Sequence, residues 1–192
     1  AIKYGGTVDK YIGDAIMIFF GDPQSKGTKK DAIACVTMAL EMKKKLRKLK
    51  KDWERTGLSE SLDVRMGIHT DVCTVGNFGS SDRLDYTVLG NGVNLASRLE
   101  SMAGANEILI SENTHNLVNK DIQSQFFSEI TVKGKAHPVK AYQVSGTVSK
   151  KIKKDIIKAS EDGFKLNLDK TKIKNKENII SILEDSIDRL LN

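Results

Sequence analysis

The sequence has few cysteines, histidines and aromatic residues, and it lacks any long apolar run. Cys35 and Cys73 are too few for a disulfide framework, and neither they nor the three histidines have the spacing of zinc ligands. No apolar stretch approaches the roughly 20 residues that cross a bilayer. We therefore expect a cytoplasmic domain with a hydrophobic core and both cysteines as packing residues, whether or not a longer parent protein carries a membrane anchor.

Basic residues are in excess, with a formal net charge of +6, but they are interspersed with acids. The densest cluster, residues 43–51, has the pattern of the solvent-exposed side of a long helix. With only 6% aromatic residues, the chain also has little material for the exposed stacking platform of an RNA-binding sheet. We therefore expect no nucleic-acid partner.

Hydrophobic patterning divides the chain into short strands and longer helices. Residues 15–20 form a continuous apolar run, as expected of a strand covered on both faces, and residues 28–55 carry apolar side chains at helical spacing. The other predicted strands are 6–12, 62–70, 84–89, 107–110, 126–133 and 139–145, the other predicted helices are 92–102 and one that begins at 111–114, and 76–82 is a turn-rich link. Hairpins that alternate with helices predict an α+β fold, with an antiparallel-rich sheet backed by helices.

The composition changes after Gly146, which divides the chain into two regions. Residues 1–146 hold the strands and helices of a predicted catalytic or binding domain. Residues 147–192 begin as a lysine-rich segment without a clear period, which predicts a linker or tail, and end with apolar residues at helical spacing, which predict a C-terminal helix. Because the chain does not begin with Met, we expect an excerpt whose regulatory or sensor domains lie outside these residues.

Asp14 is the first candidate for a functional side chain. It follows Gly13 in the tight turn between the first two predicted strands. A carboxylate at a strand end is held rigidly enough to bind a hard cation, whereas an aspartate after glycine is also a common turn residue. The position by itself leaves both interpretations open.

Asn94 and Arg98 form the second candidate group. They are four positions apart in a predicted helix, so they share one face. A carboxamide and a guanidinium that project together suit ribose and phosphate oxygens. In the alternative interpretation, Arg98 reaches into water and Asn94 caps the helix or pairs locally. The spacing alone does not choose between the two.

Four blocks of sequence together resemble the class III adenylate and guanylate cyclases. The blocks are 8–21, 64–70, 85–100 and 132–135, and the resemblance extends over residues 3–145. It implies the ferredoxin-like α+β fold of that family and a nucleotide cyclase activity. It also implies that Asp14 is the second of two aspartates that hold two Mg²⁺ or Mn²⁺ ions on the triphosphate.

The resemblance further implies which residues read the purine and hold the sugar and phosphates. Lys10 corresponds to a lysine that donates to N1 of adenine, and Thr87 to its companion, whose hydroxyl accepts from the adenine amino group. Asn94 corresponds to the residue that positions the ribose, Arg98 to the one that stabilises charge on the α-phosphate, and Lys133 to a lysine that contacts the terminal phosphates.

The resemblance thus implies a bacterial-type adenylate cyclase that converts ATP into cyclic AMP and pyrophosphate, in a head-to-tail homodimer with shared active sites. The family's first metal-binding aspartate lies on a strand upstream of the matching segment, so we expect the 192 residues to be a poor catalyst by themselves. Two alternatives stay open. One is a non-catalytic nucleotide-binding or dimerisation module of cyclase ancestry, and the other is a guanylate cyclase, against which Lys10 argues.

Overall fold

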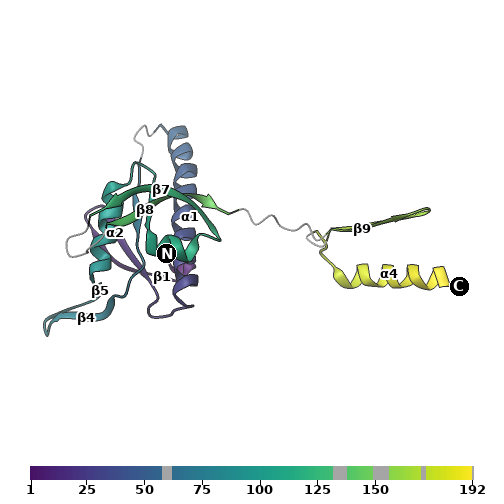
Figure 1. Ribbon diagram of the computed structural model, residues 1–192, viewed down its shortest axis with the longest axis horizontal. Helices are drawn as coiled ribbons and strands as arrows, with labels where there is room; N and C mark the ends of the chain where they lie inside the picture. Colours follow the sequence, from purple (N-terminus) through teal and green to yellow (C-terminus); the bar gives the residue numbers. More distant parts are fainter. Residues whose placement is uncertain (58–61, 132–137, 149–155, 170–171, 192) are drawn as a thin grey trace. The chain divides into compact units, whose positions relative to one another are not determined.

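The computed structural model describes residues 1–57, 62–131, 138–148, 156–169 and 172–191, and the chain divides into two compact units, Ala1–Val148 and Ser149–Asn192 (Figure 1). After a short 3-10 helix (Ile2–Tyr4), the strands of the first unit are β1 (Gly6–Ile12), β2 (Ala15–Phe20), β3 (Met66–Ile68), β4 (Thr74–Ser80), β5 (Arg83–Leu89), β6 (Ile108–Ser111), β7 (Ile122–Ile130) and β8 (Val139–Thr147). Its helices are α1 (Thr28–Arg55), α2 (Asn91–Met102) and α3 (Glu112–Val118). The predicted α+β class is confirmed.

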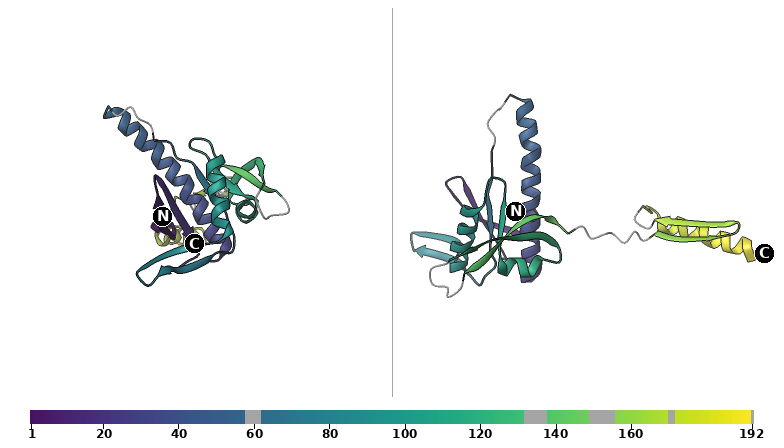
Figure 2. Two further views of the ribbon diagram at one scale, coloured as in Figure 1. Left: turned by 90° about the vertical axis from the view of Figure 1, so that its left-hand side faces the viewer. Right: turned by 45° about the horizontal axis from the view of Figure 1, so that its top comes forward.

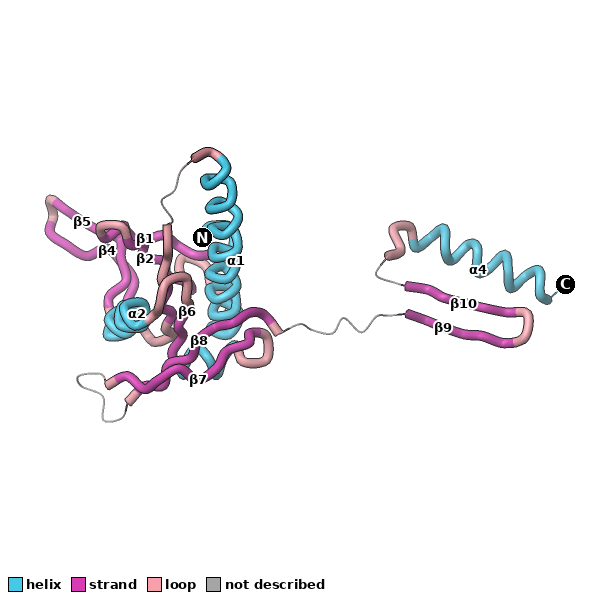
Figure 3. Tube along the Cα trace, turned by 90° about the horizontal axis from the view of Figure 1, so that it is seen from above, coloured by secondary structure: helices cyan, strands magenta, loops and turns pink. Residues whose placement is uncertain are grey.

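A four-stranded sheet in the order β3-β6-β8-β7 forms the centre of the first unit. β3 and β6 run parallel, with Met66 opposite Ile108, and the other neighbours are antiparallel. Helices α1 and α3 cover one face of this sheet and α2 covers the other (Figures 1 and 3). The side chains of β6 alternate accordingly: Ile108 and Ile110 pack toward α1 and α3, and Leu109 packs toward α2.

Helix α1 packs on the sheet through a narrow apolar stripe. Ala32, Val36 and Ala39 are buried in this stripe at helical spacing. Lys44 and Lys48, from the basic cluster, are exposed to solvent. The basic cluster therefore lies on the solvent-exposed side of the helix, as the pattern predicts.

Gly67 on β3 allows α2 to lie directly on the sheet. A Cβ added at Gly67 would stand 2.2 Å from the carbonyl oxygen of Ala96 and 2.2 Å from the amide nitrogen of Glu100, both in the backbone of α2. Because no side chain fits in that space, only glycine permits this distance between helix and strand. As a result, Leu95 and Leu99 of α2 are buried between the helix and the sheet.

Two hairpins complete the first unit. β1 and β2 pair antiparallel around the turn at Gly13 and Asp14, as predicted, and β4 and β5 pair around Ser81 and Asp82. The interpretation of residues 76–82 as a link is therefore wrong, because the backbone of most of that segment forms a ladder with β5. The end of the β4–β5 hairpin projects away from the central sheet (Figure 2).

The second unit contains β9 (Ile156–Glu161) and β10 (Phe164–Asp169), which pair antiparallel, and α4 (Lys176–Leu191). The helix lies where apolar spacing predicts one. The hairpin lies in the segment whose composition predicts a linker or tail, although Phe164, Leu166 and Leu168 of β10 alternate with polar residues as expected of a strand. Within the described residues, no helix is both long enough and apolar enough to cross a lipid bilayer.

Both cysteines carry thiols that stay protonated at physiological pH. Burial raises the pKa of Cys35, on α1, to about 12. Burial and the nearby carboxylate of Asp71 also raise the pKa of Cys73. Because the thiolate is the reactive form, both residues are poor nucleophiles and poor metal ligands, which agrees with a packing role.

Candidate active site

Lys10 and Thr87, the two predicted purine-reading residues, come together from separate hairpins. Lys10 lies on β1 and Thr87 on β5, where Thr87 is 5% exposed. Both contact the carboxylate of Asp9: the Thr87 hydroxyl donates a 2.7 Å hydrogen bond to Oδ2, and Lys10 Nζ lies 3.8 Å from Oδ1. The tertiary structure thus joins two residues that are far apart in the sequence.

Asp9 reaches both residues because β1 is irregular at this point. Val8 pairs with Ile18 and Lys10 pairs with Met17, so Asp9 is the extra residue of a β-bulge. In a regular strand the side chains of Asp9 and Lys10 would point to opposite faces. Sequence reasoning missed Asp9 for this reason, and the available signal was a carboxylate inside a predicted strand.

Contacts around Tyr86 hold β5 against the end of β2. The Tyr86 hydroxyl donates a hydrogen bond to Asp22 Oδ1, and the ring centroids of Tyr86 and Phe19 are 6.5 Å apart. The bond to the Asp22 carboxylate raises the pKa of Tyr86, so the phenol keeps the proton that it donates. Because Thr87 follows Tyr86 directly, these contacts also set the position of Thr87.

Asn94 and Arg98 share the exposed side of α2, as their spacing predicts. Both residues are exposed, whereas Leu95 and Leu99 are buried on the other side of the helix. Arg98 Nη1 donates a hydrogen bond of 3.3 Å to the backbone carbonyl of Thr131. This bond leaves most of the guanidinium donors available to a ligand.

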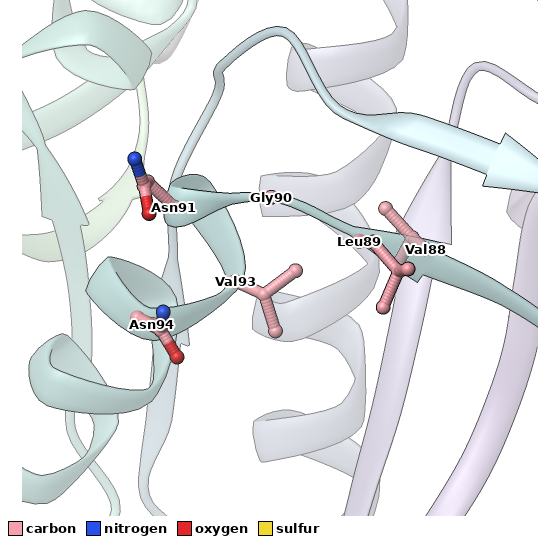
Figure 4. Close-up of a pocket in the computed structure, with 6 residues that line it drawn as sticks. All are labelled: Val88, Leu89, Gly90, Asn91, Val93 and Asn94. Atoms are coloured by element: carbon pink, nitrogen blue, oxygen red, sulfur yellow. The ribbon is translucent and has the colours of Figure 1, made fainter.

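A pocket of about 460 Å³ lies where β5 continues into α2 (Figure 4). Its lining residues are Val88, Leu89, Gly90, Asn91, Val93 and Asn94. Asn91 and Asn94 bring carboxamide groups to it from the start of α2 (Figure 4). Thr87 directly precedes the first lining residue, so a short stretch of chain connects the purine-reading and ribose-binding candidates.

Asp14 is exposed in the turn between β1 and β2. Across the part of the chain that the structure describes, no three His, Cys, Asp or Glu side chains gather closely enough to hold a metal ion. A lone carboxylate does not fit two Mg²⁺ ions, because Mg²⁺ sheds water reluctantly and needs further anionic ligands. Asp14 can therefore supply one ligand, and the described residues alone do not make the predicted two-ion site.

The six predicted site residues are distributed over few elements. Lys10 and Asp14 belong to the β1–β2 hairpin, Thr87 to β5, Asn94 and Arg98 to α2, and Lys133 lies outside the described residues. The described groups are an ammonium, a hydroxyl, a carboxamide, a guanidinium and one carboxylate. These are groups that can bind the base, the sugar and the phosphates of a nucleotide.

Comparisons with known proteins support the predicted family. The family model of the adenylate and guanylate cyclase catalytic domain matches residues 6–146. An adenylate cyclase of Anabaena cylindrica is 34% identical over 145 residues, which are 73% of this chain but only 28% of that protein, so the chain spans less than a third of this relative.

Two solved structures are similar over most of the chain. The adenylyl cyclase CyaB from P. aeruginosa is 49% identical, with a TM-score of 0.72, and the match covers 77% of this chain and 76% of that one. The guanylyl cyclase Cya2 is 32% identical, with a TM-score of 0.69, and the match covers 79% of this chain and 75% of that one.

Proposed function

The chain belongs to the adenylate and guanylate cyclase catalytic domain family, and we propose that it is part of an adenylate cyclase that converts ATP into 3′,5′-cyclic AMP and pyrophosphate for signalling in the cytoplasm. The observation that carries this proposal is the pairing of Lys10 with Thr87 around one carboxylate. An ammonium donates to adenine N1, whereas guanine has a hydrogen at N1. A threonine oxygen accepts from the adenine 6-amino group, whereas guanine has an oxygen there.

Ring closure requires the ribose 3′-oxygen to attack the α-phosphorus in line, with pyrophosphate as the leaving group. We propose that Asn94 orients the ribose and that Arg98 contacts the α-phosphate, because the two side chains share the exposed side of α2. Holding the 3′-oxygen in line lowers the activation free energy, because the entropy cost of orienting the reacting groups is met when the substrate binds. The fixed charge of Arg98 stabilises the negative charge that develops in the transition state. Lys133 is proposed to contact the terminal phosphates.

Members of this family typically use divalent metal ions. We propose that Asp14 supplies one carboxylate ligand to Mg²⁺ or Mn²⁺. Since one carboxylate does not hold two ions, the other ligands would have to come from groups beyond the described residues.

We also propose a head-to-tail homodimer in which each active site combines residues of two protomers. Asp14 would come from one protomer, and Lys10, Thr87, Asn94 and Arg98 from the other. The chain carries both sets, so a two-fold symmetric dimer would form two equivalent sites.

Two other functions are supported by specific observations. A guanylate cyclase is supported by the 32% identity to Cya2. A non-catalytic nucleotide-binding module is supported by the single carboxylate at the predicted metal site.

Turnover of ATP and GTP by the full-length gene product with Mn²⁺ separates the three functions. We expect ATP to be preferred, equal use of the two nucleotides would contradict the adenylate cyclase, and inactivity with both would favour the module.

The substitution Lys10→Glu tests the assignment of the purine-reading pair. A glutamate cannot donate to adenine N1 but can accept from guanine N1–H, so the ratio of kcat/KM for ATP to that for GTP should fall. The expected fall is about 10- to 100-fold, the range for one charge-assisted hydrogen bond. Lys48→Glu, on the exposed side of α1, makes the same charge change and should leave the ratio unaltered.

A further inference from the structure

Asp9 is a buried acid that the proposed mechanism does not use. Its side chain is 1% exposed, and its Oδ1 atom has no hydrogen-bond partner among the described residues. Burying a carboxylate without full hydrogen bonding is costly, so its presence calls for a gain elsewhere. Besides a 3.5 Å hydrogen bond that its Oδ2 atom accepts from the backbone amide of Val88, the carboxylate contacts the Thr87 hydroxyl and the Lys10 ammonium, which are the proposed purine-reading pair.

The hydrogen bond from Thr87 to Asp9 has a direct chemical consequence. A threonine hydroxyl has one hydrogen to donate and two lone pairs that accept. A carboxylate only accepts, so the hydrogen of Thr87 points to Asp9 Oδ2, at an oxygen-to-oxygen distance of 2.7 Å. Toward any third group, Thr87 can then act only as an acceptor.

We propose that Asp9 is a specificity-determining positioning residue: it holds the Thr87 hydroxyl in the orientation that accepts from the adenine 6-amino group and opposes the guanine 6-oxygen. This inference rests on the proposed function, because it names what makes the purine site selective. Without Asp9, the hydroxyl can rotate and donate to guanine O6, so threonine alone does not discriminate between the purines. In this proposal, the limit on rotation of the Thr87 hydroxyl comes from Asp9, which does not itself contact the nucleotide.

The same carboxylate keeps Lys10 beside Thr87. Lys10 Nζ lies 3.8 Å from Asp9 Oδ1, while 43% of the lysine side chain is exposed and free to meet a ligand. The β-bulge is what makes this double contact possible, because it turns Asp9 toward the side chain of its own neighbour in the strand. Asp9 therefore orients the Thr87 hydroxyl, which is the proposed acceptor, and keeps the Lys10 ammonium, which is the proposed donor, beside it.

The experiment compares Asp9→Ala with wild type in the full-length gene product, through kcat/KM for ATP and for GTP. We expect the ATP-to-GTP ratio to fall about 3- to 10-fold, the range for one neutral hydrogen bond. If Asp9 only tied the two hairpins together, its loss would lower both kcat/KM values equally, and an unchanged ratio would overturn the proposal. Asp9→Asn keeps the side-chain volume and should shift the ratio in the same direction, since a carboxamide can donate as well as accept.

A double-mutant cycle with Thr87→Val shows whether Asp9 acts through the hydroxyl. In the valine background, Asp9→Ala should leave the ratio unaltered, and a further fall of the same size would contradict the proposal. If wild type made no cyclic nucleotide at all, the proposed function would fail separately. Competition of ATP and GTP for bound mant-ATP then still decides the role of Asp9, because Asp9→Ala should reduce the preference for ATP in binding, and an unchanged preference would refute it.

Discussion

Arg98 and Asn94 lie on the exposed side of α2, whereas Leu95 and Leu99 are buried in the core. Arg98 makes a 3.3 Å hydrogen bond to the Thr131 carbonyl, and both residues are exposed. Asp9 is the opposite case, a side chain that is 1% exposed and whose carboxylate contacts two candidate ligand-binding side chains, those of Lys10 and Thr87. At the scale of single residues, exposure therefore separates Arg98 and Asn94, which are proposed to contact the nucleotide, from Asp9, which is proposed to act through Lys10 and Thr87.

Arg98→Ala should lower turnover with little effect on folding. Removing a fixed donor that stabilises transition-state charge typically costs about 10²–10³ in kcat. Since the residue is exposed, the thermal midpoint should stay close to that of wild type. Arg83→Ala, at an exposed position of β5, serves as the control and should be active. A large fall in the thermal midpoint would show instead that Arg98 is structural.

Helix α2 carries two of the proposed site residues, and its position depends on a glycine in a neighbouring strand. Gly67 has no side chain to separate β3 from the backbone of Ala96 and Glu100. Leu95 and Leu99 fill the space between the helix and the sheet. At the scale of elements, the site is placed by this close contact and by the short connection from β5 into α2.

Gly67→Ala should destabilise the domain, because the new Cβ would overlap the backbone of α2. Overpacking of this kind typically costs about 1–3 kcal/mol, which urea denaturation can measure. Gly146→Ala on β8 is a matched control, since a Cβ there would meet only Gln123 Oε1 at 4.0 Å. If Gly67→Ala were as stable as Gly146→Ala, the close packing of α2 would not be required.

At the scale of the whole molecule, the proposed homodimer would build each site from two copies of the chain. The described residues of one copy contain the proposed purine-reading pair and the proposed ribose-phosphate pair, but only one carboxylate at the predicted metal position. A shared site would supply the carboxylate of one protomer to the nucleotide held by the other. Activity would then depend on protein concentration as well as on the residues present.

Mixing two inactive variants of the full-length gene product tests the shared site. In an equimolar mixture of Asp14→Ala and Arg98→Ala, half of the dimers are mixed and each mixed dimer has one intact site, so about a quarter of wild-type activity should return. A mixture of Asn94→Ala and Arg98→Ala should stay inactive, because both changes fall in the same half of the site. No recovery in the first mixture would contradict head-to-tail sharing.

Local patterns in the sequence determined much of this protein. The β1–β2 hairpin, helix α1 and the shared face of Asn94 and Arg98 all follow the predictions, because strand alternation, helical spacing and turn chemistry depend on residues that are close together in the chain. The resemblance to the cyclases also rests on local blocks, and the family is confirmed over residues 6–146.

Only the tertiary structure decided the remainder. The strand predicted over 62–70 is limited to β3, since only this part pairs with β6, and β4 forms because its backbone finds a partner in β5. The contact between Asp9 and Thr87 joins positions 78 apart and requires a bulge that reverses the expected alternation. Pairing and bulges depend on which strand lies alongside, and neighbouring residues do not encode that.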